Sequence, residues 1–165
     1  GLLRRQRQMC IRDSLKAGKV IGLVSDAGTP GISDPGYLIV KNCIDNEIEV
    51  ECLPGPTALI PALVISGIPC ERFSFEGFLP IKKGRKKRLQ DLSEEKRTMV
   101  FYESPHKISK TLNDLKLHFG DDRKVSVSKE LTKIHESTIR STLGTISLGE
   151  GKIRGEFVIV VEGLK

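Results

Sequence analysis

The sequence of 165 residues lacks the features that mark several common protein classes. No apolar run approaches the roughly 20 residues that cross a bilayer, so we expect no membrane-spanning segment and no membrane partner. Four cysteines and three histidines include no Cys-x-x-Cys pair, which excludes the usual zinc-ligand spacing, and we expect no metal. Cys43 and Cys52 are interpreted as buried free thiols, which predicts a reducing, cytoplasmic setting.

Glycine-rich phosphate loops are also missing. Neither a Walker loop nor a G-x-G-x-x-G occurs, which disfavours a nucleotide-phosphate cradle. Repeats and low-complexity segments are absent as well. What is present, 38% hydrophobic and 29% charged residues, is typical of a soluble globular protein with one substantial domain or two small lobes.

The opening residues, 1–13, contain four arginines and one aspartate and lack the apolar stretch of a secretory signal. They could form a basic presequence, but they run directly into Leu15–Lys19, which is typical of a last helical turn ending at Gly18. We therefore expect residues 1–13 to be non-native read-through. Residues 14–79 are assigned to the remainder of an N-terminal α/β lobe, and residues 80–165 to a C-terminal α/β lobe.

The first lobe alternates strand and helix patterns. Residues 20–25 form an apolar run typical of a strand buried on both faces, and residues 48–53 predict a second strand. Asp34-Pro35 predicts the start of a helix through residue 44, and residues 58–66 predict another. So few strands leave open sheet edges, and we expect elements that belong before residue 14 to be missing.

The second lobe shows clearer periodicity. Residues 73–79, the last of the first lobe, are apolar and extended, and beyond them strands are expected near residues 98–103, 124–130, 137–142 and 157–162. Between the first and second of these strands, apolar residues at Ile108, Leu112, Leu115 and Phe119 predict one face of a helix that ends at Gly120. The whole pattern predicts an α/β fold.

Two rigid loops follow the strands expected in the first lobe. One runs from Ser25 to Gly36 and the other from Leu53 to Ala58, and ligands of open α/β sheets bind at such strand ends. The simpler interpretation is a pair of strand-to-helix connections, with Thr57 as a helix cap. The coincidence of two such loops at adjacent strand ends favours one ligand crevice, and free N–H groups after Thr57 would suit a carboxylate.

Further polar groups lie at strand ends in the second lobe. Residues 101–106 place an aromatic, a carboxylate and an imidazole together, and residues 129–133 end the next strand with charges. Core packing, helix capping and a solvated edge are the simpler roles. A basic segment precedes these motifs, and six of its seven residues are charged: Lys82, Lys83, Arg85, Lys86, Lys87 and Arg88. It is either a solvated helix start or a surface for phosphates.

Six motifs occur in the order of one known family: residues 24–30, 33–36, 53–58, 75–80, 101–106 and 130–133. In these motifs the chain resembles the bacterial small-subunit ribosomal RNA methyltransferases that modify the ribose 2′-hydroxyl of a decoding-centre cytidine, within the tetrapyrrole-methylase-like class of S-adenosylmethionine (SAM) enzymes. The resemblance covers residues 15–164. The family's Pro-x-Pro-x-Gly-Asn loop and Glu-Asp-Thr-Arg segment are absent here, which agrees with an incomplete first lobe.

The resemblance implies a two-lobed class III methyltransferase fold, with SAM in the cleft between the lobes, 16S ribosomal RNA or the small ribosomal subunit as partner, and a homodimer. It implies cofactor contacts from both lobes: Asp26, Ala27, Gly28, Thr29, Pro30, Thr57, Ala58, Tyr102, Leu131 and Thr132. A ribose hydroxyl is a weak nucleophile, so a general base could assist it. The candidates are Glu103, His106 and Glu130, and the sequence does not choose among them.

Two other functions stay open. One is a methyltransferase of the same fold that modifies carbon in a porphyrin or corrin precursor. The other is a non-catalytic RNA-binding fragment. The charge pattern favours RNA: of the net +6, residues 1–13 carry +3 and residues 82–88 carry +6, so the remainder is mildly acidic at −3.

Overall fold

The computed structural model describes residues 2–149, 151 and 153–165, with side chains from Met9 onward in the same ranges. It divides into two compact units, residues 1–57 and 58–165. The sequence placed the lobe boundary between residues 79 and 80. The difference has a structural cause: strand β1, Phe73–Gly77, pairs with a strand of the second unit and therefore belongs to it.

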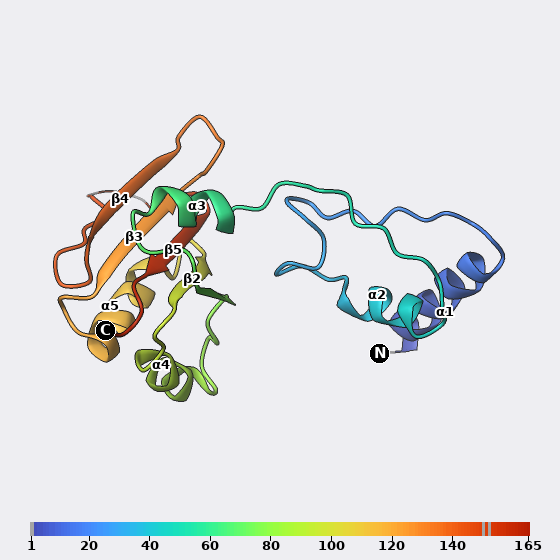
Figure 1. The fold of residues 1–165 in the computed structure, drawn as a ribbon, viewed down its shortest axis with the longest axis horizontal. Coiled ribbons are helices and arrows are strands. Elements are labelled where there is room, and N and C mark those ends of the chain that lie inside the picture. Colours follow the sequence, from blue (N-terminus) through green and yellow to red (C-terminus); the bar gives the residue numbers. More distant parts are fainter. Residues whose placement is uncertain (1, 150, 152) are drawn as a thin grey trace. The chain divides into compact units, whose positions relative to one another are not determined.

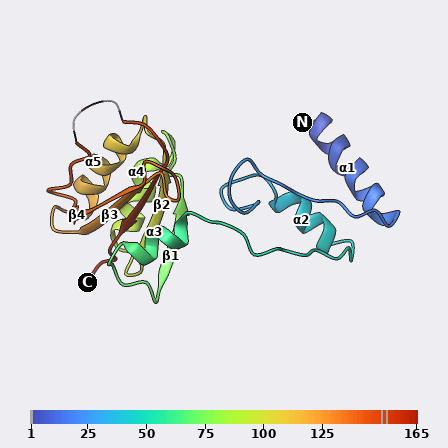
Figure 2. The ribbon, with the colours of Figure 1, turned by 90° about the horizontal axis from the view of Figure 1, so that it is seen from above.

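The second unit is built on one five-stranded sheet in the order β1-β2-β5-β3-β4 (Figures 1 and 2). Strand β1 runs parallel to β2, Thr98–Glu103, and the remaining pairs are antiparallel. The other strands are β3, Lys124–Lys129, β4, Ser137–Thr142, and β5, Phe157–Val161. The four strands expected in the second lobe are present, with bounds that differ by at most one residue, and the extended residues 73–79 contain β1.

Helices cover both faces of this sheet. Helix α3, Leu59–Ile65, packs on one face, and helices α4, Arg85–Ser93, and α5, Ile108–Phe119, pack on the other (Figure 2). The α3-side core consists of Leu59, Ala62, Leu63, Ile68, Val100, Val158 and Val160. The α5-side core includes Leu89, Met99, Phe101, Leu115, Val127, Phe157 and Ile159. Because side chains alternate along a strand, neighbouring residues of β2 serve different cores.

Helix α5 confirms the periodicity that predicted it. Ile108, Leu112, Leu115 and Phe119 are all buried in the α5-side core, and Gly120 ends the helix. The helix begins at Ile108. The chain first makes a turn over residues 104–107, and the Ile108 N–H donates to the Ser104 carbonyl at 3.0 Å.

The first unit contains two helices in the described residues, α1, Leu2–Lys16, and α2, Tyr37–Ile44. Residues 2–13, which the sequence set aside, form most of α1, and Gly18 follows its end at φ +80° as expected. Helix α2 begins after Gly36, two residues later than Asp34-Pro35 predicted, and the N–H groups of Ile39 and Val40 donate to the Gly36 carbonyl.

The prediction of strands at residues 20–25 and 48–53 is wrong. Neither segment is a strand, and Val20 and Val24 are 100% and 86% exposed. A strand exists only with a hydrogen-bonded neighbour, and no strand lies in the described part of residues 1–57 to pair with these segments. Their apolar side chains are therefore left at the surface of this unit.

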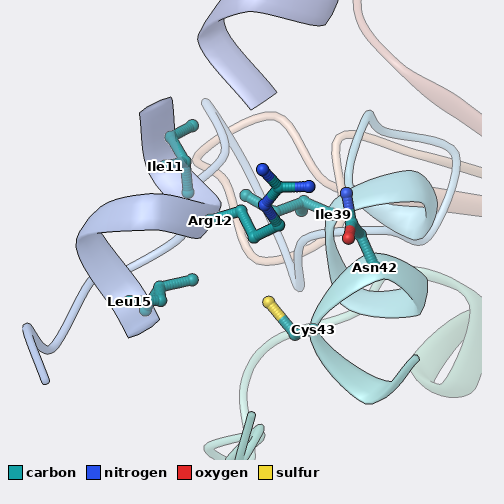
Figure 3. A pocket seen from close by; sticks show the side chains of 6 residues that line it. All are labelled: Ile11, Arg12, Leu15, Ile39, Asn42 and Cys43. Atoms are coloured by element: carbon teal, nitrogen blue, oxygen red, sulfur yellow. The ribbon is translucent and has the colours of Figure 1, made fainter. Parts of the chain in front are cut away.

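Helices α1 and α2 meet through a small apolar contact. Figure 3 shows Ile11 and Leu15 of α1 beside Ile39 and Cys43 of α2, around a cavity of about 10 Å³. That volume holds no more than about one water molecule, so it is no ligand site. Cys43 is a buried free thiol, as expected, whereas Cys52 is exposed, as are all of residues 49–56 around it.

Candidate functional site

The two loops of the first unit lie against each other. The Thr29 hydroxyl donates to the Pro56 carbonyl at 3.1 Å, and the Ser25 hydroxyl closes the same loop onto the Gly28 carbonyl at 3.0 Å. A Cβ added at Gly28 would lie 3.4 Å from the Pro56 carbonyl oxygen, so the two backbones approach closely there. The sequence expected these loops to be neighbours, and this contact is present. Asp26 and Ala27 are exposed beside it, and Pro30 is half-buried.

Thr57 does not cap the helix that follows it. Ala58 occupies the cap position of α3, and no side chain satisfies the helix's first N–H groups. The Thr57 hydroxyl oxygen is buried, and no hydrogen-bond partner for it occurs among the described residues. A buried hydroxyl without a partner is unusual, and it suits contact with a polar ligand atom better than the capping role does.

Tyr102 and Leu131 share the α3 face of the sheet, where both pack against the α3-side core. The Tyr102 ring also meets Phe75 and Phe78 edge to face, with ring centroids 4.9 and 5.8 Å away. Phe75 lies within β1 and Phe78 directly follows it, so three rings gather near the end of β2. The structure thus places two of the predicted cofactor residues on one face, beside an aromatic cluster.

Glu103 points to the opposite face from Tyr102. Its side chain is buried, and both carboxylate oxygens accept hydrogen bonds: one from the Ser104 N–H at 2.7 Å and one from the Thr111 hydroxyl at 2.6 Å. These contacts hold the turn before α5. The sequence named Glu103 as a candidate base, and the geometry disfavours this role, because the carboxylate is engaged in a buried network and faces away from the Tyr102 side.

Arg85 completes that network from α4. Its guanidinium donates to the Thr111 hydroxyl at 2.9 Å, to the Asp114 carboxylate at 2.8 Å and to the Pro80 carbonyl at 3.1 Å. Partial burial raises the pKa of Asp114, but the hydrogen bonds from Arg85 and Lys110 outweigh it and leave the pKa below its ordinary value. Arg85 was predicted to bind RNA, and the geometry disfavours this role, because its side chain is only 9% exposed.

The other charged residues of the basic segment 82–88 differ in whether they form an ion pair. Arg88 pairs with Glu76, whose side chain is 6% exposed, so Arg88 balances a buried carboxylate while remaining half-exposed itself. The lysines are exposed, and no ion pair involves them in the described part of the chain: Lys82, Lys83, Lys86 and Lys87. These four are called the lysine patch below. The charge available to an anionic partner is thus smaller than the sequence indicated.

Glu130 is held at the end of β3 by backbone and side-chain contacts. One carboxylate oxygen accepts from the Glu156 N–H at 2.9 Å and from the Lys133 ammonium at 3.0 Å. The Glu156 N–H and then Lys133 lower the pKa of Glu130, while Glu156 and Glu130 raise the pKa of Lys133. A carboxylate with a lowered pKa is a weaker base, so this arrangement disfavours the catalytic role considered for Glu130.

His106 and Thr132 are both exposed. His106 lies in the turn over residues 104–107 that Glu103 holds in place, and no hydrogen bond from its ring is present in the described structure. Thr132 has φ +66°, and its N–H donates to the Glu136 carboxylate at 2.6 Å. Of the three candidate bases, His106 is therefore the one whose side chain is not engaged elsewhere.

The sequence missed the partners that fix these groups: Thr111, Asp114, Glu136, Gly155 and Glu156. Glu156 is 26 residues from Glu130, so no local pattern could link them. The second unit also has a cavity of about 180 Å³ beside β3, β4 and β5, lined by residues such as Val127, Ser137 and Phe157. None of the residues predicted for the site lines it.

The comparisons with known proteins agree in pointing to one family. The family model described as tetrapyrrole (corrin/porphyrin) methylases matches residues 3–147. That match begins inside the segment that the sequence had set aside as non-native. No helix in the described residues is long and apolar enough to cross a membrane.

Several bacterial proteins named ribosomal RNA small subunit methyltransferase I are similar in sequence. The protein of Mycobacterium tuberculosis is 46% identical over 95% of this chain, and that of Synechocystis is 49% identical over 90%. The Escherichia coli protein is 43% identical over 98% of this chain. The chain spans little more than half of each of these relatives, from 54% to 58%.

Solved structures show the same fold at much lower identity. The methyltransferase CobJ aligns with 95% of this chain and 70% of its own, with a TM-score of 0.69 and 19% identity. A uroporphyrin-III C-methyltransferase from Thermus thermophilus, in complex with S-adenosylhomocysteine, aligns with 96% of this chain and 72% of its own, at TM-score 0.61 and 16% identity. The expected tetrapyrrole-methylase-like α/β fold is confirmed.

Proposed function

Because the chain belongs to the tetrapyrrole methylase family, we propose that the protein is a SAM-dependent methyltransferase of small-subunit ribosomal RNA. The observation that carries the proposal is a contrast in identity. Proteins named for ribosomal RNA methylation are 43–49% identical to this chain, whereas the two methyltransferases of solved structure named above, one of them a uroporphyrin-III C-methyltransferase, are at most 19% identical. Since the chain spans about half of those relatives, the proposal concerns the whole protein.

The finer assignment is methyl transfer to the ribose 2′-hydroxyl of a decoding-centre cytidine in 16S ribosomal RNA. It rests on the resemblance in residues 101–106 and 130–133, which also supports a cytoplasmic homodimer as the working form. Methylation of a tetrapyrrole carbon is the alternative for the same fold, and RNA binding without catalysis is the alternative for the chain as given.

The residues present fit the cofactor that this chemistry needs. In the first unit, the buried Thr57 hydroxyl has no hydrogen-bond partner among the described residues. In the second unit, Tyr102 and its aromatic neighbours offer an apolar wall, and Leu131 lies on the same face. Bound SAM supplies a methyl group on a positively charged sulfur, activated without a metal. The protein's task is then to orient the ribose oxygen.

His106 is the general base we propose. Its imidazole is exposed, and the turn that carries it is fixed through Ser104 and Glu103. Because the ring makes no hydrogen bond in the described structure, it can accept the hydroxyl proton without breaking a contact of its own. Glu103 and Glu130 would have to break buried or charge-assisted hydrogen bonds to do the same.

Methyl transfer with defined acceptors tests the function. The full-length gene product is incubated with radiolabelled SAM and one of three acceptors: unmodified small ribosomal subunits, free 16S RNA or a reduced uroporphyrin. We expect label in RNA, and nuclease digestion with mass spectrometry should place it on a ribose. A His106→Ala variant should turn over about 10²- to 10⁴-fold more slowly with unchanged SAM affinity. His118→Ala, on α5, is the matched control.

The outcomes separate the three functions. Label in the tetrapyrrole would replace the RNA proposal with carbon methylation. RNA binding without label, although SAM binds, would show a non-catalytic module. Full turnover in the His106→Ala variant would remove only the assignment of the base.

A further inference from the structure

The loop after β3 has an unusual backbone. Glu130 and Thr132 have φ of +51° and +66°, within three positions of each other, and neither is glycine. For a β-branched residue such as threonine this left-handed conformation is a true outlier. Such strain persists only where surrounding contacts over-determine it, and it concentrates at ligand clamps and active sites.

Glu130 joins this loop to the segment that enters β5. The Glu130 N–H donates to the Glu156 carbonyl at 3.0 Å, and the Glu156 N–H donates back to the Glu130 carboxylate at 2.9 Å. Lys133 bridges the two carboxylates, at 3.0 Å from Glu130 and 2.8 Å from Glu156. Backbone and side chain of Glu130 are therefore fixed together.

Gly155 makes room for this arrangement. A Cβ at this position would lie 2.6 Å from Cγ and 2.8 Å from Cδ of Glu130, so any larger residue would push the Glu130 side chain away. The Gly155 backbone, at φ +96°, is itself one that other residues rarely adopt. Two requirements therefore select glycine at position 155: the space taken by the Glu130 side chain and the positive φ of the backbone.

Glu136 fixes the other strained residue. Its carboxylate accepts the Thr132 N–H at 2.6 Å, and its own N–H donates to the Lys133 carbonyl at 3.1 Å. The Lys133 N–H donates to the Glu130 carbonyl at 2.9 Å. Leu131 and Thr132 thus lie between two fixed points, Glu130 on one side and the Lys133–Glu136 turn on the other. Leu131 packs on the face that carries Tyr102, while Thr132 is left exposed.

We propose that Lys133, Glu136 and Gly155 are positioning residues that hold Leu131 and Thr132 in the conformation that contacts SAM. The inference rests on the proposed function, since it names the residues that shape one wall of that site. Thr132 is exposed, yet its strained backbone is fixed by Glu136 and by the Glu130–Lys133 pair. This is the arrangement expected where a loop presents a side chain to a ligand rather than to the core.

The first test uses the 165-residue chain without cofactor. Amide hydrogen exchange measured by NMR should show a protected Thr132 N–H in the unaltered chain. Glu136→Ala should speed its exchange about 10- to 100-fold, because a charge-assisted hydrogen bond is lost. Glu136→Gln keeps an acceptor oxygen and should restore most of the protection. Glu71→Ala, at an exposed glutamate outside the loop, is the control. Equal protection in the Glu136→Ala and Glu71→Ala chains would overturn the proposal.

The second test measures SAM affinity of the full-length gene product by calorimetry. Gly155→Ala should weaken SAM binding at least about tenfold and raise KM for SAM more than it lowers kcat. Gly120→Ala is the matched control, because Gly120 has φ +89° but no atom within 4 Å of an added Cβ. It should bind SAM normally while showing similar backbone strain.

The results distinguish this inference from the function it rests on. If the unaltered protein does not bind SAM, the proposed function fails. If it binds SAM and the Gly155→Ala variant binds equally well, the function stands and the positioning role is overturned. Should Gly155→Ala unfold, Glu136→Ala introduces no clash and serves in its place, with unchanged SAM affinity as the contrary result.

Discussion

At the scale of single residues, the acidic groups of this chain stabilise loops more than they present free carboxylates. Glu103 and Glu130 each end a strand, which is where catalytic carboxylates are often found, yet each accepts hydrogen bonds that fix the following turn. The strand-end position was visible in the sequence. The hydrogen-bond donors to these carboxylates could not be recognised in the sequence, because they include Thr111 and Glu156, which lie farther along the chain.

Arg85 provides the clearest residue-scale prediction. Its guanidinium satisfies Asp114, Thr111 and a backbone carbonyl, and Thr111 in turn satisfies Glu103. Arg85→Ala should therefore lower the free energy of unfolding by about 3 kcal/mol, since it leaves buried acceptors and charge uncompensated. Arg85→Lys should lose less, because charge remains but one ammonium cannot reach all three partners.

Chemical denaturation with urea measures both effects. Lys86→Ala is the matched control from the same helix, and its exposed side chain should change the unfolding free energy by no more than about 0.5 kcal/mol. A loss for Arg85→Ala as small as that control would mean that the buried network contributes little.

At the scale of elements, the strands predicted from the sequence are present where a partner strand lies beside them. Residues 98–103 and 157–161 form buried strands as expected, and they pair with each other. Residues 20–25 have the same apolar pattern but no neighbouring strand in the described chain, so the pattern alone misled. Helix α5 could be predicted from its own sequence, because the spacing of its apolar residues is local. The pairing of β1 with β2 could not, because it joins residues far apart in the chain.

The lysine patch leads to a prediction about the start of α4. Four exposed lysines should contact phosphates, while Arg85 and Arg88 serve intramolecular partners. Replacing all four with glutamine should reduce the slope of log affinity for RNA against log salt by about 3, at roughly 0.7–0.9 per phosphate contact. Fluorescence anisotropy at several salt concentrations gives this slope.

A charge-matched control separates local contact from net charge. It replaces four exposed lysines elsewhere in the second unit: Lys96, Lys110, Lys124 and Lys165. This control should leave the slope nearly unchanged. If both sets reduce it equally, the lysine patch has no special role in RNA binding.

At the scale of the whole molecule, the two units differ in how much apolar surface they bury. Both core clusters and all five strands belong to residues 58–165. In residues 9–57, Cys43 is the one buried apolar side chain among those described, while Val20, Val24 and Leu53 are mostly exposed. Burial of apolar surface is the main stabilising contribution to folding, so the stability of the chain resides in the second unit.

We therefore expect residues 58–165, expressed alone, to unfold in one cooperative transition with an enthalpy of about 75 kcal/mol near 60 °C, the value usual for that length. In the 165-residue chain, amides of β2 and β5 should exchange only through global unfolding, and those of residues 20–25 should exchange nearly unprotected. Calorimetry and hydrogen exchange measure these two quantities. Strong protection at residues 20–25 would show that the apolar segment has found a strand partner, such as a second copy of the chain, and protection that rises with protein concentration would identify that copy as the partner.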